Sequence, residues 1–182
     1  MKIMIASDIH GSSYYCRKLV EQFKNSGCQK LVLLGDILYH GPRNDLPKEY
    51  DPKQVISTLN DIKSDILCVR GNCDTEVDQM VLDFPILSDY AVIWDSEATL
   101  YLSHGHKTSE LEKNLNGKDV LLCGHTHVPC VKLNENYTYI NPGSVSIPKE
   151  ASPNSYIIYE SGKFSWYDID SQEIFRRFSL NI

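Results

Sequence analysis

The chain has 182 residues, of which 42% are hydrophobic and 23% are charged, close to ordinary globular values. These proportions exclude a largely disordered chain, and the net charge of −6 argues against a general nucleic-acid binder. No stretch approaches the roughly 20 apolar residues of a membrane helix, and Asp8 interrupts the first apolar run before the core of a signal peptide could form. We therefore expect one cytoplasmic domain over residues 1–182.

The first half of the chain alternates predicted strands and helices. Three apolar runs are typical of buried strands: residues 2–7, 31–34 and 66–69. Between them, apolar residues recur at helical spacing from Cys16 to Phe23, and again from Val55 to Ile62 after the start signal Asp51-Pro52. The order strand, helix, strand, helix, strand predicts a sheet that begins with parallel strands.

The second half consists mainly of predicted strands joined by short turns. Their ranges are 90–95, 99–103, 119–123, 128–133, 137–141, 155–159, 163–168 and 173–180. Several of them alternate apolar and polar residues, which is typical of sheets with one solvated face. No repeat or linker divides the chain, so we expect two packed sheets with helices outside. The six cysteines show no CxxC spacing, which favours reduced thiols over a disulfide framework.

Polar residues suited to bind metal follow five of the predicted strands. They are Asp8 and His10, Asp36, Asn72, His104 and His106, and His125 and His127. Taken singly, most of these have an ordinary explanation as turns or helix caps. Their order after successive strands favours a shared site, because open α/β sheets bind ligands at the carboxyl ends of their strands. Mixed imidazole and carboxylate donors suit manganese, iron, zinc, cobalt or nickel better than calcium or magnesium.

The motifs resemble the signature of the calcineurin-like metallophosphoesterases. They read Asp8-Ile9-His10, Gly35-Asp36, Gly71-Asn72-Cys73-Asp74, His104-Gly105-His106 and Gly124-His125-Thr126-His127. Residues 41–44 and 141–148 are similar to the YfcE-like branch of phosphodiesterases in particular, and the similarity covers nearly the whole chain. This resemblance implies an α/β fold, a four-layer αββα sandwich of two mixed β-sheets.

The resemblance also implies a pair of divalent metal ions. Asp8, His10, Asp36 and His127 would hold one ion, and Asp36 as a bridge, Asn72, His104 and His125 would hold the other. Manganese is the ion expected, with zinc, iron, nickel and cobalt as alternatives. The implied activity is hydrolysis of a small phosphodiester substrate by a water or hydroxide that bridges the two ions.

Cys73 departs from most of the superfamily, which has a histidine after the asparagine ligand. A thiol is a weaker hydrogen-bond donor than imidazolium, so we expect activity biased towards diesters. The alternative is that Cys73 only lines the pocket. Arg43 and Asn44 are expected to contact a substrate phosphate, or else to be a solvated loop arginine and a turn asparagine.

Two residues of these motifs are expected to act by positioning other residues. His106 is expected to orient a ligand rather than bind metal itself. Asp74 is expected to hydrogen-bond a ligand histidine, or else to cap the helix-like run from Thr75 to Leu82.

A non-catalytic scaffold is the alternative function, since a retromer subunit shares this fold with a degraded metal site. That alternative predicts missing ligands, and every ligand position is filled here. Ile37, Leu38 and Leu46 offer apolar side chains for a partner surface. A homodimer or homotetramer is the oligomeric state expected from base rates.

Overall fold

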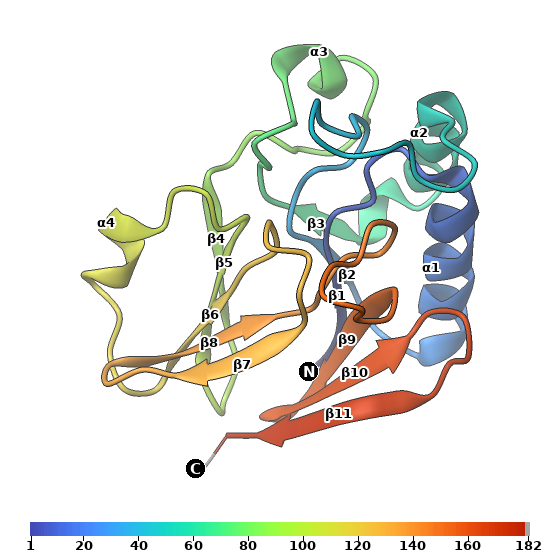
Figure 1. Ribbon diagram of the computed structural model, residues 1–182. Helices are drawn as coiled ribbons and strands as arrows, with labels where there is room; N and C mark the ends of the chain where they lie inside the picture. The colour runs from blue at the N-terminus through green and yellow to red at the C-terminus, as the bar shows by residue number, and fades with distance from the viewer. Residues whose placement is uncertain (181–182) are drawn as a thin grey trace.

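A computed structural model describes residues 1–180 of the chain and contains two β-sheets that pack face to face (Figure 1). The first sheet contains β1 (Lys2–Ala6), β2 (Leu31–Leu33), β3 (Ile66–Cys68), β9 (Ser155–Glu160), β10 (Lys163–Asp168) and β11 (Ile174–Ser179). The second contains β4 (Tyr90–Trp94), β5 (Thr99–Ser103), β6 (Asp119–Leu122), β7 (Cys130–Leu133) and β8 (Tyr137–Asn141). Their strand orders are β11-β10-β9-β1-β2-β3 and β4-β5-β6-β8-β7.

Both sheets are mixed. In the first sheet β1, β2 and β3 run parallel, as predicted, while β9 pairs with β1 in the antiparallel direction. In the second sheet β6 is parallel to both β5 and β8, and the outer strands β4 and β7 are antiparallel to their neighbours. The expected four-layer αββα sandwich of two mixed sheets is therefore confirmed.

Helices α1 (Ser13–Ser26) and α2 (Pro52–Asn60) cover the outer face of the first sheet (Figure 1). The Ser12 side chain caps the start of α1 by accepting a hydrogen bond from the Tyr15 N–H, and α1 ends at Gly27. Asp51 caps α2 in the same way, with Pro52 in its first turn. Three short elements complete the helices: a 3-10 turn (Lys63–Asp65), α3 (Glu76–Gln79) and α4 (Ser109–Glu112).

Three apolar clusters separate the four layers. Alternate side chains of β1 divide between two of them: Ile3 and Ile5 face the second sheet, whereas Met4 and Ala6 face α1 and α2. The third cluster lies under α4 and includes Leu115 and Leu121. The period-two alternation of the strands thus accounts for the layering.

Several expected features differ in detail from the structure. The strand expected from residue 128 begins at Cys130, because the preceding residues form the loop that carries two of the histidines. Ile37 and Leu38 are buried in the core, so they form no partner surface, and only Leu46 of that trio is exposed.

Two further features concern the cysteines and the helices. All six cysteines are free thiols. Among residues 1–180, no helix is long and apolar enough to cross a bilayer.

Candidate metal centre

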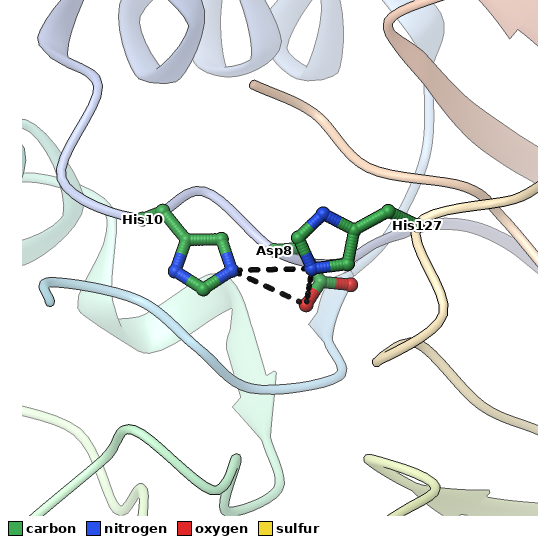
Figure 2. A group of neighbouring side chains, drawn as sticks. All are labelled: Asp8, His10 and His127. Atoms are coloured by element: carbon green, nitrogen blue, oxygen red, sulfur yellow. Dashed lines mark hydrogen bonds and ion pairs between the residues drawn. The ribbon is translucent and has the colours of Figure 1, made fainter. Parts of the chain in front are cut away.

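Five loops at the carboxyl ends of β1, β2, β3, β5 and β6 bring the predicted metal-binding residues together. The loop after β1 carries Asp8 and His10, and the loop after β6 carries His127, 117 residues along the chain from His10. All three side chains are buried. Figure 2 shows that the carboxylate of Asp8 and the rings of His10 and His127 point toward one another.

The spacing of this first group matches the donor atoms around one ion. His10 Nε2 lies 3.6 Å from Asp8 Oδ1 and 3.4 Å from His127 Nε2, and His127 Nε2 lies 3.3 Å from Asp8 Oδ1 (Figure 2). Metal–ligand distances of about 2.0–2.2 Å place neighbouring donor atoms about 3–3.5 Å apart. A single ion of this size fits between the three side chains.

Asp36 connects this first group to a second one. Its Oδ2 lies 3.6 Å from His10 Nε2 and 3.5 Å from His104 Nε2. On the far side, His104 Nε2 lies 3.0 Å from Asn72 Oδ1 and 3.2 Å from His125 Nδ1. The structure therefore brings all seven predicted ligands together, with Asp36 between the two groups.

In three of the histidines, the ring nitrogen that faces away from the centre, Nδ1, fixes the orientation of the ring. Nδ1 of His10, His104 and His127 lies 2.7, 2.7 and 2.6 Å from the backbone oxygens of Tyr39, Leu34 and Ile147, respectively. When each Nδ1–H donates to its carbonyl, the Nε2 lone pair points into the centre.

Lone pairs that face one another require a cation between them. His10 Nε2 and His127 Nε2 would otherwise repel each other across 3.4 Å. Asp8 Oδ1 is buried at the same point and, within the described part of the chain, has no hydrogen-bond partner. The donor set therefore fits divalent metal ions at two positions, one beside Asp8 and one beside His104.

The buried carboxylates also shift the proton affinity of their neighbours. Burial alone would lower the pKa of His104, but a hydrogen bond and the charge of Asp36 raise it to about 9. Burial alone would raise the pKa of Asp8, yet the neighbouring imidazoles of His10 and His127 hold it well below its ordinary value. The cluster thus attracts positive charge, which protons or metal ions supply.

The backbone of the centre is held in an uncommon conformation. Five of the seven predicted ligands have positive φ angles: Asp8 (60°), His10 (48°), Asp36 (56°), His125 (66°) and His127 (62°). A non-glycine residue in this region costs of order 1–3 kcal/mol and persists only where its surroundings enforce it. Such strain is typical of functional sites, and five of the ten non-glycine residues with positive φ among residues 1–180 are predicted ligands.

Two glycines let the loops approach closely. A Cβ atom on Gly71 would overlap the backbone nitrogen of Asp36, and one on Gly124 would overlap Ser7 Oγ and crowd Asp8 Oδ2. The glycine before Asn72 and the glycine before His125 are therefore steric requirements of the centre.

Asp74 has a role that differs from both sequence-based expectations. Its buried carboxylate accepts hydrogen bonds from the backbone N–H groups of Asp36 (2.8 Å), Ile37 (2.9 Å) and Gly71 (2.7 Å). It binds none of the ligand histidines, and the residue that caps α3 is Thr75. Asp74 fixes the loop after β2 against the loop after β3, a role that the sequence does not signal because its partners are backbone groups.

Ser144 and Ser146 support the loop that carries Asp8, a role that their sequence pattern does not indicate. Both hydroxyls donate to the backbone oxygen of Asp8, at 2.9 and 3.1 Å, and the neighbouring Ile147 oxygen accepts from His127. Both serines lie in residues 141–148, whose sequence indicates only the resemblance to the YfcE-like branch. The structure shows that this segment supports the turn that carries Asp8.

Cys73 lies beside the first metal-binding group. Its Sγ and ligand atoms of His10 and Asp36 all lie within 4.8 Å of one another. The Cys73 N–H donates to Asp36 Oδ1 at 2.8 Å, and Asn72 Nδ2 donates to Cys73 Sγ at 3.3 Å. Burial and the charge of Asp36 raise the pKa of the Cys73 thiol to about 12.

The loop after β2 places the other expected substrate-binding residues at the rim of the centre. Asn44 Nδ2 donates to the His40 carbonyl at 2.8 Å, and a Cβ on Gly41 would contact both this nitrogen and Cys73 Sγ. Arg43 is exposed and forms no ion pair with any residue from 1 to 180. His106 stacks edge-on against His104 with ring centroids 5.4 Å apart.

Comparisons with known proteins show that the chain is similar to phosphoesterases over most or all of its length. The model of the calcineurin-like phosphoesterase superfamily domain matches residues 1–163. Phosphodiesterase YfcE of Escherichia coli (strain K12) is 44% identical over 182 residues, which cover 100% of this chain and 99% of the relative. The solved structure of that E. coli phosphoesterase has a TM-score of 0.92 to this chain at 44% identity and full coverage of both chains. A zinc complex of Vps29 from Entamoeba histolytica has a TM-score of 0.59 at 16% identity over 100% of both chains, which shows the fold alone.

Proposed function

The chain belongs to the calcineurin-like phosphoesterase superfamily, and on that premise we propose that it is a phosphodiesterase with a two-metal centre. The first ion is held by Asp8, His10, Asp36 and His127, and the second by Asp36, Asn72, His104 and His125. One observation carries the proposal. Asp36 Oδ2 is almost equally far from His10 Nε2 and His104 Nε2, 3.6 and 3.5 Å, as expected for a carboxylate shared by two ions.

When bound, a pair of divalent ions activates water and neutralises charge on the phosphate that is attacked. The residues of this chain hold and orient that centre. Backbone carbonyls fix the rings of His10, His104 and His127, so that little rearrangement is needed during the reaction. Asp36 sets the separation of the two positions, and Asp74 holds Asp36 in place through its backbone N–H.

Manganese is the ion that we propose for this centre. Four imidazoles, two carboxylates and one amide oxygen form a mixed donor set that suits manganese, and the same set accepts zinc, iron, nickel or cobalt. His125 differs from the other three histidines because its Nδ1, not its Nε2, faces the centre.

Small phosphodiesters are the substrate class that we propose. Cys73 occupies the position next to Asn72, where an imidazolium would stabilise the extra charge of a phosphate monoester. A thiol supplies no such charge. Asn44 at the rim is proposed to contact the substrate phosphate after giving up its bond to the His40 carbonyl, and exposed Arg43 to approach it from solvent.

The scaffold alternative has less support. Every ligand position is filled, and the fold relatives named Vps29 are distant, at 16% identity for the zinc complex. The decisive experiment replaces Asp8 with Asn and measures hydrolysis of bis(4-nitrophenyl) phosphate by manganese-loaded protein. We expect turnover to fall by at least about 100-fold, since one metal-binding carboxylate and its charge are lost.

Asp61→Asn is the matched control, because Asp61 is an exposed residue at the end of α2 and lies outside the centre. This variant should retain full turnover. If wild-type protein loaded with manganese hydrolyses no phosphodiester, the proposed function is wrong.

A second copy of this chain is the protein partner that we propose. Strand β4 pairs only with β5 among the described strands, so its other edge is open. Tyr90, Val92 and Trp94 alternate along it with exposed fractions of 55%, 36% and 83%. Antiparallel pairing of two β4 edges would satisfy the open backbone groups and place the exposed stripes of the two copies side by side. Light scattering should give a dimer for wild type and for Leu133→Lys, on the opposite edge strand, but a monomer for Trp94→Lys.

A further inference from the structure

We propose that Cys73 Sγ is a further ligand of the first metal position when that position takes a thiophilic ion such as zinc or cadmium. The inference rests on the proposed metal centre and adds a sulfur donor to it. Manganese, which prefers oxygen and nitrogen donors, would leave this thiol unbound. The same centre would then bind hard and soft ions with different ligand sets.

The geometry places sulfur at a coordination position. Sγ of Cys73, a ring nitrogen of His10 and a carboxylate oxygen of Asp36 all lie within 4.8 Å of one another. Around one ion, a sulfur and a nitrogen on opposite sides are about 4.4 Å apart, given bond lengths of about 2.3 and 2.1 Å. The proposal therefore requires Cys73 Sγ to bond to the same ion that His10 and Asp36 would hold.

A second observation points to a cation at this position. Asp8 Oδ1 belongs to a fully buried carboxylate and, across residues 1–180, it lacks any hydrogen-bond partner. It faces His10 Nε2 at 3.6 Å, and this is the same nitrogen that faces Asp36. The ion that would satisfy Asp8 therefore lies beside Cys73 as well.

Two hydrogen bonds position Cys73 Sγ for metal binding. The Cys73 N–H is tied to Asp36 Oδ1 at 2.8 Å, which fixes the backbone next to the first position. Asn72 turns its oxygen towards His104 and its amide nitrogen towards Cys73 Sγ, 3.3 Å away. Asn72 thus serves the second metal position with its oxygen and orients the sulfur with its N–H.

The chemistry is a ligand exchange without oxidation or reduction. The S–H bond of Cys73 breaks, its proton leaves to solvent, and the sulfur lone pair forms a bond to the ion. Soft thiolate ligands bind zinc more tightly than manganese, and cadmium is softer still. Cysteine in place of histidine here would thus set the response to metals as well as the substrate preference.

Cadmium is the probe, because a cadmium–thiolate bond produces an ultraviolet charge-transfer band that oxygen and nitrogen ligands do not. The whole protein is titrated with cadmium chloride, and absorption and bound cadmium are measured together. We expect the absorbance of this band to rise with added cadmium and to level off at the intensity of one cadmium–sulfur bond per chain. In Cys73→Ser the band should disappear and cadmium affinity should fall by about tenfold or more.

Cys28→Ser and Cys130→Ser are matched controls, since both thiols are half-buried like Cys73 but lie outside the centre. Both should keep the band. A measurement on wild type guards against misfolding of Cys73→Ser: alkylation of Cys73, followed by mass spectrometry, should be slowed by cadmium and not by manganese.

The inference is overturned if cadmium binds to wild type without a charge-transfer band, or if the band persists in Cys73→Ser. It is also overturned if cadmium leaves the alkylation of Cys73 unchanged. Manganese-dependent diester hydrolysis by the same wild-type sample tests the proposed function separately. If wild type hydrolyses the diester but the charge-transfer band persists in Cys73→Ser, the sulfur ligand is rejected and the phosphodiesterase proposal is retained.

Discussion

The carboxylate of Asp74 lies 2.8 Å from the backbone nitrogen of Asp36 and accepts its hydrogen. The same oxygen accepts from Gly71 N–H, and the other oxygen accepts from Ile37 N–H. Asp36 is the carboxylate between the two proposed metal positions, and Gly71 immediately precedes Asn72. A buried carboxylate outside the predicted ligand set thus positions predicted ligands from the loops after two strands.

Replacement of Asp74 with Asn should weaken both the fold and the centre. The amide NH2 would face at least one of the three N–H donors and leave it unsatisfied, which costs about 2–3 kcal/mol for a bond to a charged group. We expect this loss in the free energy of unfolding, measured by urea denaturation, and lower diester turnover as well. Asp61→Asn is the control and should change stability by less than about 0.5 kcal/mol. Equal stability of the two variants would contradict the role given to Asp74.

Gly124→Ala should disrupt the turn between β6 and the two histidines that follow it. The added methyl group would overlap Ser7 Oγ and crowd Asp8 Oδ2, so the loop must shift at a cost of about 1–3 kcal/mol. Gly117→Ala is the matched control, because its methyl group meets no atom within 4 Å. The midpoint temperature of thermal unfolding and the manganese affinity should both fall in Gly124→Ala and not in Gly117→Ala. A Gly124→Ala protein with unchanged manganese affinity would show that the turn has room to adapt.

Removal of metal should lower the thermal stability of the protein. His10 and His127 present facing lone pairs 3.4 Å apart, and a cation removes that repulsion only in the folded state. An ion at 100 times its dissociation constant adds about 2.7 kcal/mol per site. For a chain of this size, that gain raises the unfolding midpoint by about 5–10 °C. Calorimetry with manganese and after chelation measures the difference, and identical midpoints would contradict a metal centre built from these residues.

Cys73→His should shift the substrate preference towards phosphate monoesters. An imidazolium beside the first metal position would stabilise the additional negative charge that the thiol leaves unbalanced. The measurement is the ratio of kcat/KM for 4-nitrophenyl phosphate to that for bis(4-nitrophenyl) phosphate. We expect this ratio to rise by at least about tenfold, which corresponds to about 1.4 kcal/mol of transition-state stabilisation. Cys130→His, outside the centre, should leave the ratio unchanged, and the same ratio in Cys73→His would mean that the thiol only lines the pocket.

Much of the fold was predictable because its signals are local. The apolar runs that became β1, β2 and β3, the Asp51-Pro52 helix start and the alternating late strands all depend on near neighbours in the sequence. The short helix α4 was not predicted, since four residues carry too little periodicity. Strand order was not predicted either, because pairing such as that of β1 with β9 joins residues more than 150 positions apart.

The sequence by itself determined which side chains were available as metal ligands and that each followed a strand. The bridging position of Asp36 is expected from the family resemblance, but only the tertiary structure decided which ring nitrogen of each histidine faces inward. It also decided that Asp74 holds the loops rather than the histidines. The reason is physical: donor types are a property of residues, whereas these arrangements depend on backbone carbonyls and N–H groups, which every residue carries and no sequence distinguishes.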